Sequence, residues 1–139
     1  MSLDYSFIII DDSELDRYVT QKFLVRTSNG FIIKTFHDAE QALEIIGESH
    51  DLAGSTPVII LLDLQMPYMN GFQFVEEFEK LSAEIQKQYM IIVLTVLSSN
   101  SDPNDIQRIF THKTVKSVIE KPLTKEKLNA LLELMESNN

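Results

Sequence analysis

Five short apolar runs alternate with amphipathic stretches along the chain, and this alternation constrains the fold more than any other feature of the sequence. The runs are rich in Ile and Val and mostly continuous, which is typical of strands buried on both faces of a parallel sheet. Strands that alternate with helices imply right-handed crossovers, with helices covering both faces of the sheet. The predicted strands are Phe7–Ile10, Phe31–Phe36, Val58–Leu62, Met90–Val96 and Val115–Ile119.

A helical pattern of apolar residues follows each run, so a strand and a helix are repeated five times. Ser13 and Asp16 have the spacing of a capping box at the start of the first helix. Asp38 is the expected cap of the second helix, and Asp102 followed by Pro103 is the expected start of the fourth. The first helix has as its apolar face Leu15, Tyr18, Val19 and Phe23.

The chain length of 139 residues suits one domain and is too short for an eight-unit barrel. The prediction is therefore an α/β fold: a doubly wound, five-stranded parallel sheet in a single domain over residues 1–139. Residues 1–5 are expected to form an N-terminal tail. Met1-Ser2-Leu3 has the look of a cloning remnant, in which case the chain is an excised domain.

Composition excludes several classes of function. A net charge of −9 argues against nucleic acid and against anionic membrane surfaces as partners. The absence of cysteine removes disulfides, thiolate zinc sites and cysteine nucleophiles, and it fits a cytoplasmic location. The longest apolar stretch, Met90–Leu97, is far shorter than a membrane span.

Polar residues follow four of the five predicted strands at the point where each strand ends. Ligands of doubly wound sheets bind at this edge, so these side chains are expected to converge. Three carboxylates in one pocket repel each other, and Mg²⁺ with oxygen ligands is the natural compensation. An aspartate beside Mg²⁺, an ammonium and a hydroxyl is equipped to attack a phosphoryl group. The residues are Asp11, Asp12, Asp63, Thr95 and Lys121.

The most specific motif surrounds Asp63. Met66-Pro67 follows it at three and four positions, and Asn70-Gly71 at seven and eight. With these motifs in this order, the chain resembles the receiver domain of bacterial two-component response regulators over essentially its whole length. The remaining motifs that carry the resemblance are Asp11-Asp12, Thr95 and Lys121-Pro122.

The resemblance implies a flavodoxin-like strand order 2-1-3-4-5 and a signalling module rather than an enzyme. It implies that Asp63 accepts a phosphoryl group from a histidine kinase or a histidine phosphotransfer protein. Thr95 and Lys121 would contact the phosphoryl oxygens, and the Lys121–Pro122 peptide would be cis. Mg²⁺ is the implied cofactor, with ligands from Asp11, Asp12 and Asp63 and from the backbone carbonyl of Gln65.

Two positions depart from the family pattern. Val118 stands where receivers often carry a Tyr or Phe that couples to the threonine, so activation is not expected to swing an aromatic ring there. Val96 follows Thr95 where the family usually has a small residue, and together with Leu97 it is expected to crowd an acyl phosphate. We hypothesise from them that spontaneous dephosphorylation is slow.

One helix follows Lys121-Pro122, so the sequence predicts no tethered output domain. The signal is then expected to pass to an unknown partner protein that binds the face formed by the fourth helix, the fifth strand and the fifth helix. A homodimer that forms on phosphorylation is one such contact. The alternatives are a receiver excised from a larger hybrid kinase or regulator, and a Mg²⁺-dependent phosphohydrolase with an aspartate nucleophile. The phosphohydrolase is disfavoured because Gln65 stands where it needs a second acid.

Overall fold

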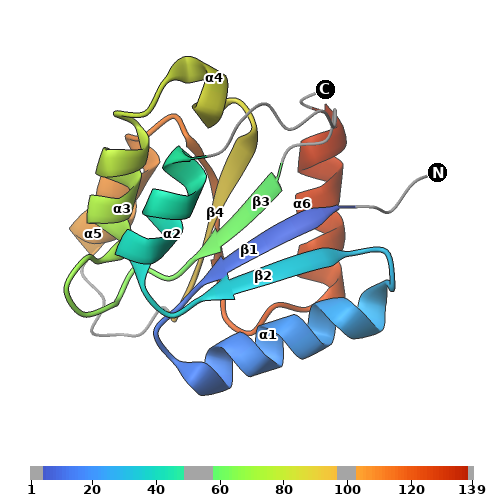
Figure 1. Cartoon of the computed structure of the whole chain (residues 1–139). Coiled ribbons are helices and arrows are strands. Elements are labelled where there is room, and N and C mark those ends of the chain that lie inside the picture. Colours follow the sequence, from blue (N-terminus) through green and yellow to red (C-terminus); the bar gives the residue numbers. More distant parts are fainter. Residues whose placement is uncertain (1–4, 49–57, 97–102, 138–139) are drawn as a thin grey trace.

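The sheet has five parallel strands in the order β2-β1-β3-β4-β5 in the computed structural model, which describes residues 5–48, 58–96 and 103–137 (Figure 1). The predicted doubly wound sheet and its strand order are confirmed. The central strand β3 is buried along its whole length, as its continuous apolar sequence predicts. The strands are β1 (Ser6–Ile10), β2 (Ile32–Phe36), β3 (Val58–Leu62), β4 (Tyr89–Thr95) and β5 (Val115–Glu120).

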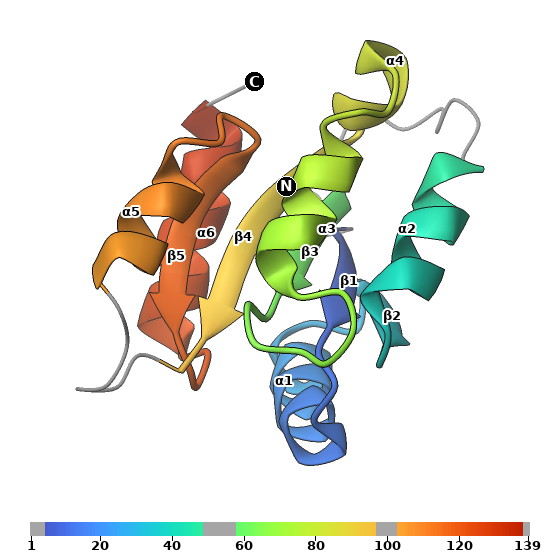
Figure 2. The same ribbon diagram turned by 90° about the vertical axis from the view of Figure 1, so that its left-hand side faces the viewer.

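Helices cover both faces of the sheet. α1 and α6 pack on one face, and α2, α3 and α5 pack on the other (Figure 2). The short helix α4 was not predicted, because a single turn carries too few residues to show a helical period. The helices are α1 (Glu14–Thr27), α2 (Ala39–Gly47), α3 (Gly71–Phe78), α4 (Ala83–Gln86), α5 (Pro103–Phe110) and α6 (Lys125–Ser137).

Two positions near the start of the sheet differ from the sequence prediction. β2 was predicted to be buried on both faces, but Ile32 is 58% exposed because β2 lies at the edge of the sheet. Tyr5 was expected in a tail, yet it is buried, and its ring packs edge-on against Phe31. Met1–Leu3 and the predicted helix cap Asp102 lie outside the described residues.

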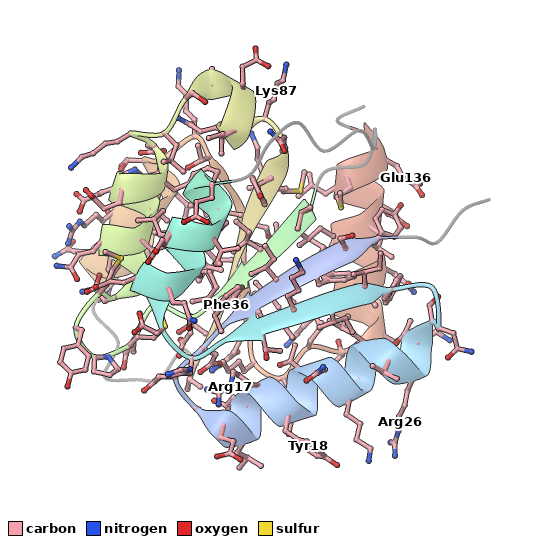
Figure 3. The ribbon with its side chains drawn as sticks, viewed as in Figure 1. Arg17, Tyr18, Arg26, Phe36, Lys87 and Glu136 are labelled. Carbon is pink, nitrogen blue, oxygen red and sulfur yellow. The ribbon has the colours of Figure 1, made fainter. Side chains whose placement is uncertain are left out.

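Helix α1 is rotated relative to the prediction. Leu15 is 69% exposed and Tyr18 57% exposed, whereas Thr20 and Leu24 are buried against the sheet. Figure 3 shows Tyr18 pointing away from the sheet. The predicted apolar face was therefore wrong for Leu15, Tyr18 and Val19, whereas Phe23 packs, partly buried, against the core. Helix α1 carries apolar residues on more than one side, and periodicity alone does not decide which side meets the core.

In the part of the chain that the structure describes, no helix combines the length and the apolar character that crossing a bilayer would require.

Candidate functional site

The carboxyl ends of β1, β3, β4 and β5 bring four predicted site residues to one edge of the sheet. Two backbone hydrogen bonds align these ends: the Asp63 N–H donates to the Ile10 carbonyl at 3.0 Å, and the Lys121 N–H donates to the Thr95 carbonyl at 2.8 Å. Parallel strands place their carboxyl ends together, so residues far apart in the chain become neighbours.

Asp63 lies at the centre of this edge and is only 7% exposed. Its Oδ1 accepts a hydrogen bond of 2.8 Å from the buried hydroxyl of Thr95 and one of 3.4 Å from the Gln65 N–H. The Lys121 ammonium lies 3.5 Å from Asp63 Oδ2. Each oxygen of the carboxylate therefore faces a donor that can also stabilise negative charge added to it.

Lys121 is held by two further carboxylates. Its Nζ donates to Asp11 Oδ2 at 2.6 Å and to Asp16 Oδ2 at 2.8 Å. Burial on its own would lower the pKa of Lys121, but the hydrogen bonds that its ammonium donates to Asp11 and Asp16, together with the charge of Asp63, more than offset it, so the pKa is raised. Lys121 is thus a permanent positive charge in the site at any physiological pH.

Asp16 is the site residue that sequence reasoning missed. It was assigned to a capping box with Ser13, but only half of that box forms: the Ser13 hydroxyl accepts from the Asp16 N–H at 3.1 Å. The Ser13 N–H donates instead to Asp11 Oδ1 at 2.9 Å, which leaves the Asp16 carboxylate for Lys121. A signal was available, since Asp16 lies one helical turn after Asp12 and therefore near the same sheet edge.

Asp11 is buried and almost fully engaged. Burial raises the pKa of its carboxyl, opposed by the hydrogen bonds from Lys121 and from the Ser13 N–H, and the net direction is upward. The Arg17 guanidinium donates to the Asp11 carbonyl at 2.7 Å and so ties α1 to the end of β1.

The carboxylates of Asp11, Asp12 and Asp63 have oxygen atoms within 4.8 Å of one another. Asp12 is exposed to solvent, whereas the other two are buried. Among the described residues, the Lys121 ammonium contacts the carboxylates of Asp11, Asp16 and Asp63, and Asp12 lies beside them, so acids outnumber the ammonium in the site. An all-oxygen donor set that opens to water on one side fits a hard divalent cation such as Mg²⁺.

The loop after Asp63 is fixed by Gly71 and by the cap of α3. A Cβ at Gly71 would lie 2.7 Å from both the Asp63 carbonyl and Leu64 Cα, so only glycine fits. The φ of Gly71 is not positive, so glycine is required here by the close approach of the backbone and not by a left-handed conformation. Asn70 and Gln73 form a reciprocal capping box.

The remaining predicted features have mixed outcomes. The Lys121–Pro122 peptide is cis, as expected. Val118 packs, partly buried, against the core cluster beneath α2, α3 and α5. Val96 is 56% exposed beside Thr95, and Leu97 lies outside the described residues. The slow dephosphorylation inferred from Val96 and Leu97 therefore stays a prediction, as does the backbone carbonyl of Gln65 as a metal ligand.

Comparison with known proteins shows the family of the chain. The family model of the response regulator receiver domain matches residues 7–133. The chain belongs to the response regulator receiver family. Receiver domains act in two-component signalling as modules that exchange signals with histidine kinases or phosphotransfer proteins, and a pocket of aspartates at the strand ends is consistent with this role.

Individual relatives agree with this assignment. The chain is 31% identical over 125 residues to the autoinducer 1 sensor kinase/phosphatase LuxN of Vibrio harveyi, covering 89% of this chain but only 12% of that protein. A receiver protein from Dyadobacter fermentans has 28% identity and a TM-score of 0.79, covering 93% of this chain and 95% of its own. A two-component response regulator from Cytophaga hutchinsonii shares the fold, with 24% identity and a TM-score of 0.78. The match covers 95% of this chain and 96% of that one.

Proposed function

We propose that Asp63 takes a phosphoryl group from a phosphohistidine donor. The observation that carries this proposal is the buried Asp63 carboxylate, with Thr95 Oγ1 at 2.8 Å from one oxygen and Lys121 Nζ at 3.5 Å from the other. A carboxylate oxygen attacks phosphorus, the N–P bond of the donor breaks, and its electron pair leaves with the imidazole. Asp63 becomes an acyl phosphate.

Thr95 and Lys121 then change partners. The Thr95 hydroxyl, which donates to Asp63 Oδ1, re-aims at a phosphoryl oxygen. Lys121 exchanges part of its contact with Asp11 and Asp16 for the phosphoryl group, which carries more negative charge than either carboxylate. Because the Lys121 N–H is bonded to the Thr95 carbonyl, both changes are felt at the ends of β4 and β5.

The proposed cofactor is Mg²⁺, held by Asp12, Asp63 and Asp11 and by the Gln65 carbonyl. When bound, it supplies positive charge against the phosphoryl oxygens. Support comes from the charge balance, because Lys121 is the one ammonium that contacts Asp11, Asp16 and Asp63 among the described ion pairs. Asp12 is exposed and Asp11 already accepts from Lys121, so Asp12 is the more direct ligand of the two.

The proposed donor is a histidine kinase or a histidine phosphotransfer protein that docks on α1. This helix reaches the site through Asp16 and presents Leu15, Tyr18 and Val19 to solvent beside it. An exposed apolar patch next to a phosphoacceptor suits a partner that must bring a reactive histidine close. We place this exchange in the cytoplasm, where the donor kinase has its ATP.

The proposed output surface is the face formed by α5, β5 and α6, which corresponds to the face expected from the sequence. These elements lie side by side at the β5 edge of the sheet (Figure 2), and Phe110 on α5 is 55% exposed. Output would then be a contact with a downstream protein or with a second phosphorylated copy. A receiver excised from a larger hybrid kinase remains the alternative, favoured by the match to a small part of a sensor kinase.

The test is incubation with acetyl phosphate and Mg²⁺, followed by intact-mass measurement. We expect one acid-labile phosphoryl group on the wild-type protein and on Asp38→Asn, a control at the exposed cap of α2. Asp63→Asn should gain none. Equal labelling of Asp63→Asn would refute the site. Continuous release of phosphate from p-nitrophenyl phosphate would favour the phosphohydrolase instead.

A further inference from the structure

The end of the sheet opposite the phosphoacceptor carries a hollow of about 550 Å³ lined by residues of α4, β4 and β5 and of the turn before β5. Figure 3 shows Lys87 at this end and Arg17, which contacts Asp11, at the other. The lining residues are Ala83, Gln86, Lys87, Tyr89, Met90, Lys113, Thr114 and Lys116. No acid is among them, in a chain whose net charge is −9. We call this feature the lysine hollow.

A register shift between β4 and β5 places Lys116, one of the three lysines, at the hollow. Ile91 pairs with Val115 and Ile92 pairs with Ser117, so Lys116 is an extra residue between two ladder positions. Bulges of this kind re-aim a side chain and are rare between parallel strands. The bulge keeps Val115 in the core while Lys116 is exposed at the rim of the hollow.

The second lysine is carried by a turn that is fastened on both sides. The Glu79 carboxylate contacts His112 Nδ1 at 2.7 Å and accepts from the Thr114 hydroxyl at 2.7 Å. Lys113 lies between these two anchored residues, so its backbone position is fixed before any ligand arrives. The third lysine, Lys87, caps α4 and pairs with Glu84 in an exposed ion pair, which is weak enough to exchange for another anion.

The neutral donors around the hollow are already in use. Gln86 Nε2 donates to the Glu79 and Leu81 carbonyls, and the Thr114 hydroxyl donates to Glu79. A small ligand such as a nucleotide would need such donors to fix its orientation. What the hollow offers instead is three lysines around Tyr89 and Met90, of which Lys87 would exchange its exposed pairing with Glu84 for the ligand.

We propose that the lysine hollow binds an acidic peptide segment of a protein partner. In an extended segment, alternate side chains lie roughly 6.6 Å apart and point to the same side, so successive carboxylates can reach separate ammonium groups. Lysines suit this because each is a flexible point charge. The acidic remainder of the surface repels such a segment, which directs it to this end of the molecule.

The test is fluorescence anisotropy with a fluorescein-labelled poly-aspartate peptide and the unphosphorylated full chain. The triple variant Lys87→Gln, Lys113→Gln and Lys116→Gln should bind about tenfold more weakly, because three ion pairs are lost. The control removes the same charge from exposed lysines outside the hollow, Lys22→Gln, Lys34→Gln and Lys125→Gln, and should stay within about twofold of wild type. All six lysines are exposed, so both variants are expected to fold.

Backbone amide shifts provide the second readout. Peptide should shift the amides of Tyr89 and of residues 113–116 and leave those of Asp11 and Asp63 unchanged, and Asp63→Asn should bind as wild type does. Equal weakening of both triple variants would overturn the proposal, because net charge alone would then explain binding. Tighter binding of ATP than of peptide at the hollow would also overturn it, because the occupant would be a nucleotide.

Discussion

Lys121 Nζ donates to Asp16 Oδ2 across 2.8 Å, although the two residues are 105 positions apart in the chain. This contact joins the first helix to the end of the last strand beside Asp63, the proposed phosphoacceptor. On the proposed function, Asp16 competes with a phosphoryl group on Asp63 for the Lys121 ammonium.

Asp16→Asn should therefore strengthen binding of beryllofluoride, a mimic of the phosphoryl group. We expect a gain of about two- to fivefold, the range of a partly exposed ion pair. Glu14→Gln is the matched control, because it removes an acid from the same exposed helical turn without contacting Lys121. Titration followed by NMR would measure both affinities, and an equal gain in the control would rule out competition for Lys121.

Thr95→Ala should destabilise the protein and weaken the site together. Thr95 is 2% exposed, and its loss leaves Asp63 Oδ1 without its shortest hydrogen bond, at a cost of about 1–3 kcal/mol. Thr95→Ser keeps the hydroxyl and should retain phosphorylation by acetyl phosphate. Urea denaturation and labelling measure the two effects. If the Ser and Ala variants label equally slowly, the methyl group rather than the hydroxyl is responsible.

Two glycines provide a matched pair. A Cβ at Gly71 would lie 2.7 Å from backbone atoms of the Asp63 loop, which is closer than van der Waals contact allows. A Cβ at Gly47 would have as its nearest neighbour a side-chain carbon at 3.7 Å, which is an ordinary contact. Gly71→Ala should lower the free energy of unfolding by about 1–3 kcal/mol, because the Asp63 loop must move. Gly47→Ala should raise it by up to about 1 kcal/mol through helix propensity. Chemical denaturation tests both, and equal effects would contradict the steric argument.

The contacts of the Glu79 carboxylate make the stability of the protein depend on pH. Burial would raise the pKa of the Glu79 carboxyl, but hydrogen bonds from Thr114 and His112 and the charge of His112 hold it below its ordinary value. A carboxyl with a lowered pKa in the folded state stabilises the protein above its unfolded pKa, and this contribution is lost as the pH falls through the folded pKa.

The free energy of unfolding of Glu79→Gln should thus be lower than that of wild type by about 1 kcal/mol at neutral pH. The difference should shrink as the pH is lowered below the ordinary carboxyl pKa of about 4.3. Urea titrations at several pH values measure it. If the difference in free energy of unfolding between wild type and Glu79→Gln stayed constant until the carboxyl groups were protonated, the charge of Glu79 would not contribute to stability.

Donor docking on α1 can be separated from chemistry at Asp63. Leu15→Ala removes an exposed apolar side chain, so it should slow phosphotransfer from a phosphohistidine protein while leaving labelling by acetyl phosphate unchanged. Leu24→Ala, on the buried side of the same helix, should instead cost about 2–5 kcal/mol of stability. If Leu15→Ala slowed labelling by acetyl phosphate as much as phosphotransfer from the protein donor, the substitution would act on the site and not on a docking surface.

The fold class and the members of the central cluster follow from local sequence patterns. Strand type follows from continuous Ile and Val runs, and parallel topology carries the residues after each strand to one edge. Asp11, Asp63, Thr95 and Lys121 were therefore predictable as neighbours, because their position depends on where a strand ends and not on how side chains pack.

The side of α1 that meets the core and the role of Asp16 depend instead on contacts made in the folded chain. Leu15 and Leu24 have the same side chain, but only Leu24 lies between α1 and the sheet. The contacts of Asp16 and Arg17 at the sheet edge set the rotation of the helix that places it there. Lys116 is a second case, since the bulge that exposes it is a mismatch between two strands. Such features depend on contacts between segments far apart in the chain, and a local sequence pattern does not contain them.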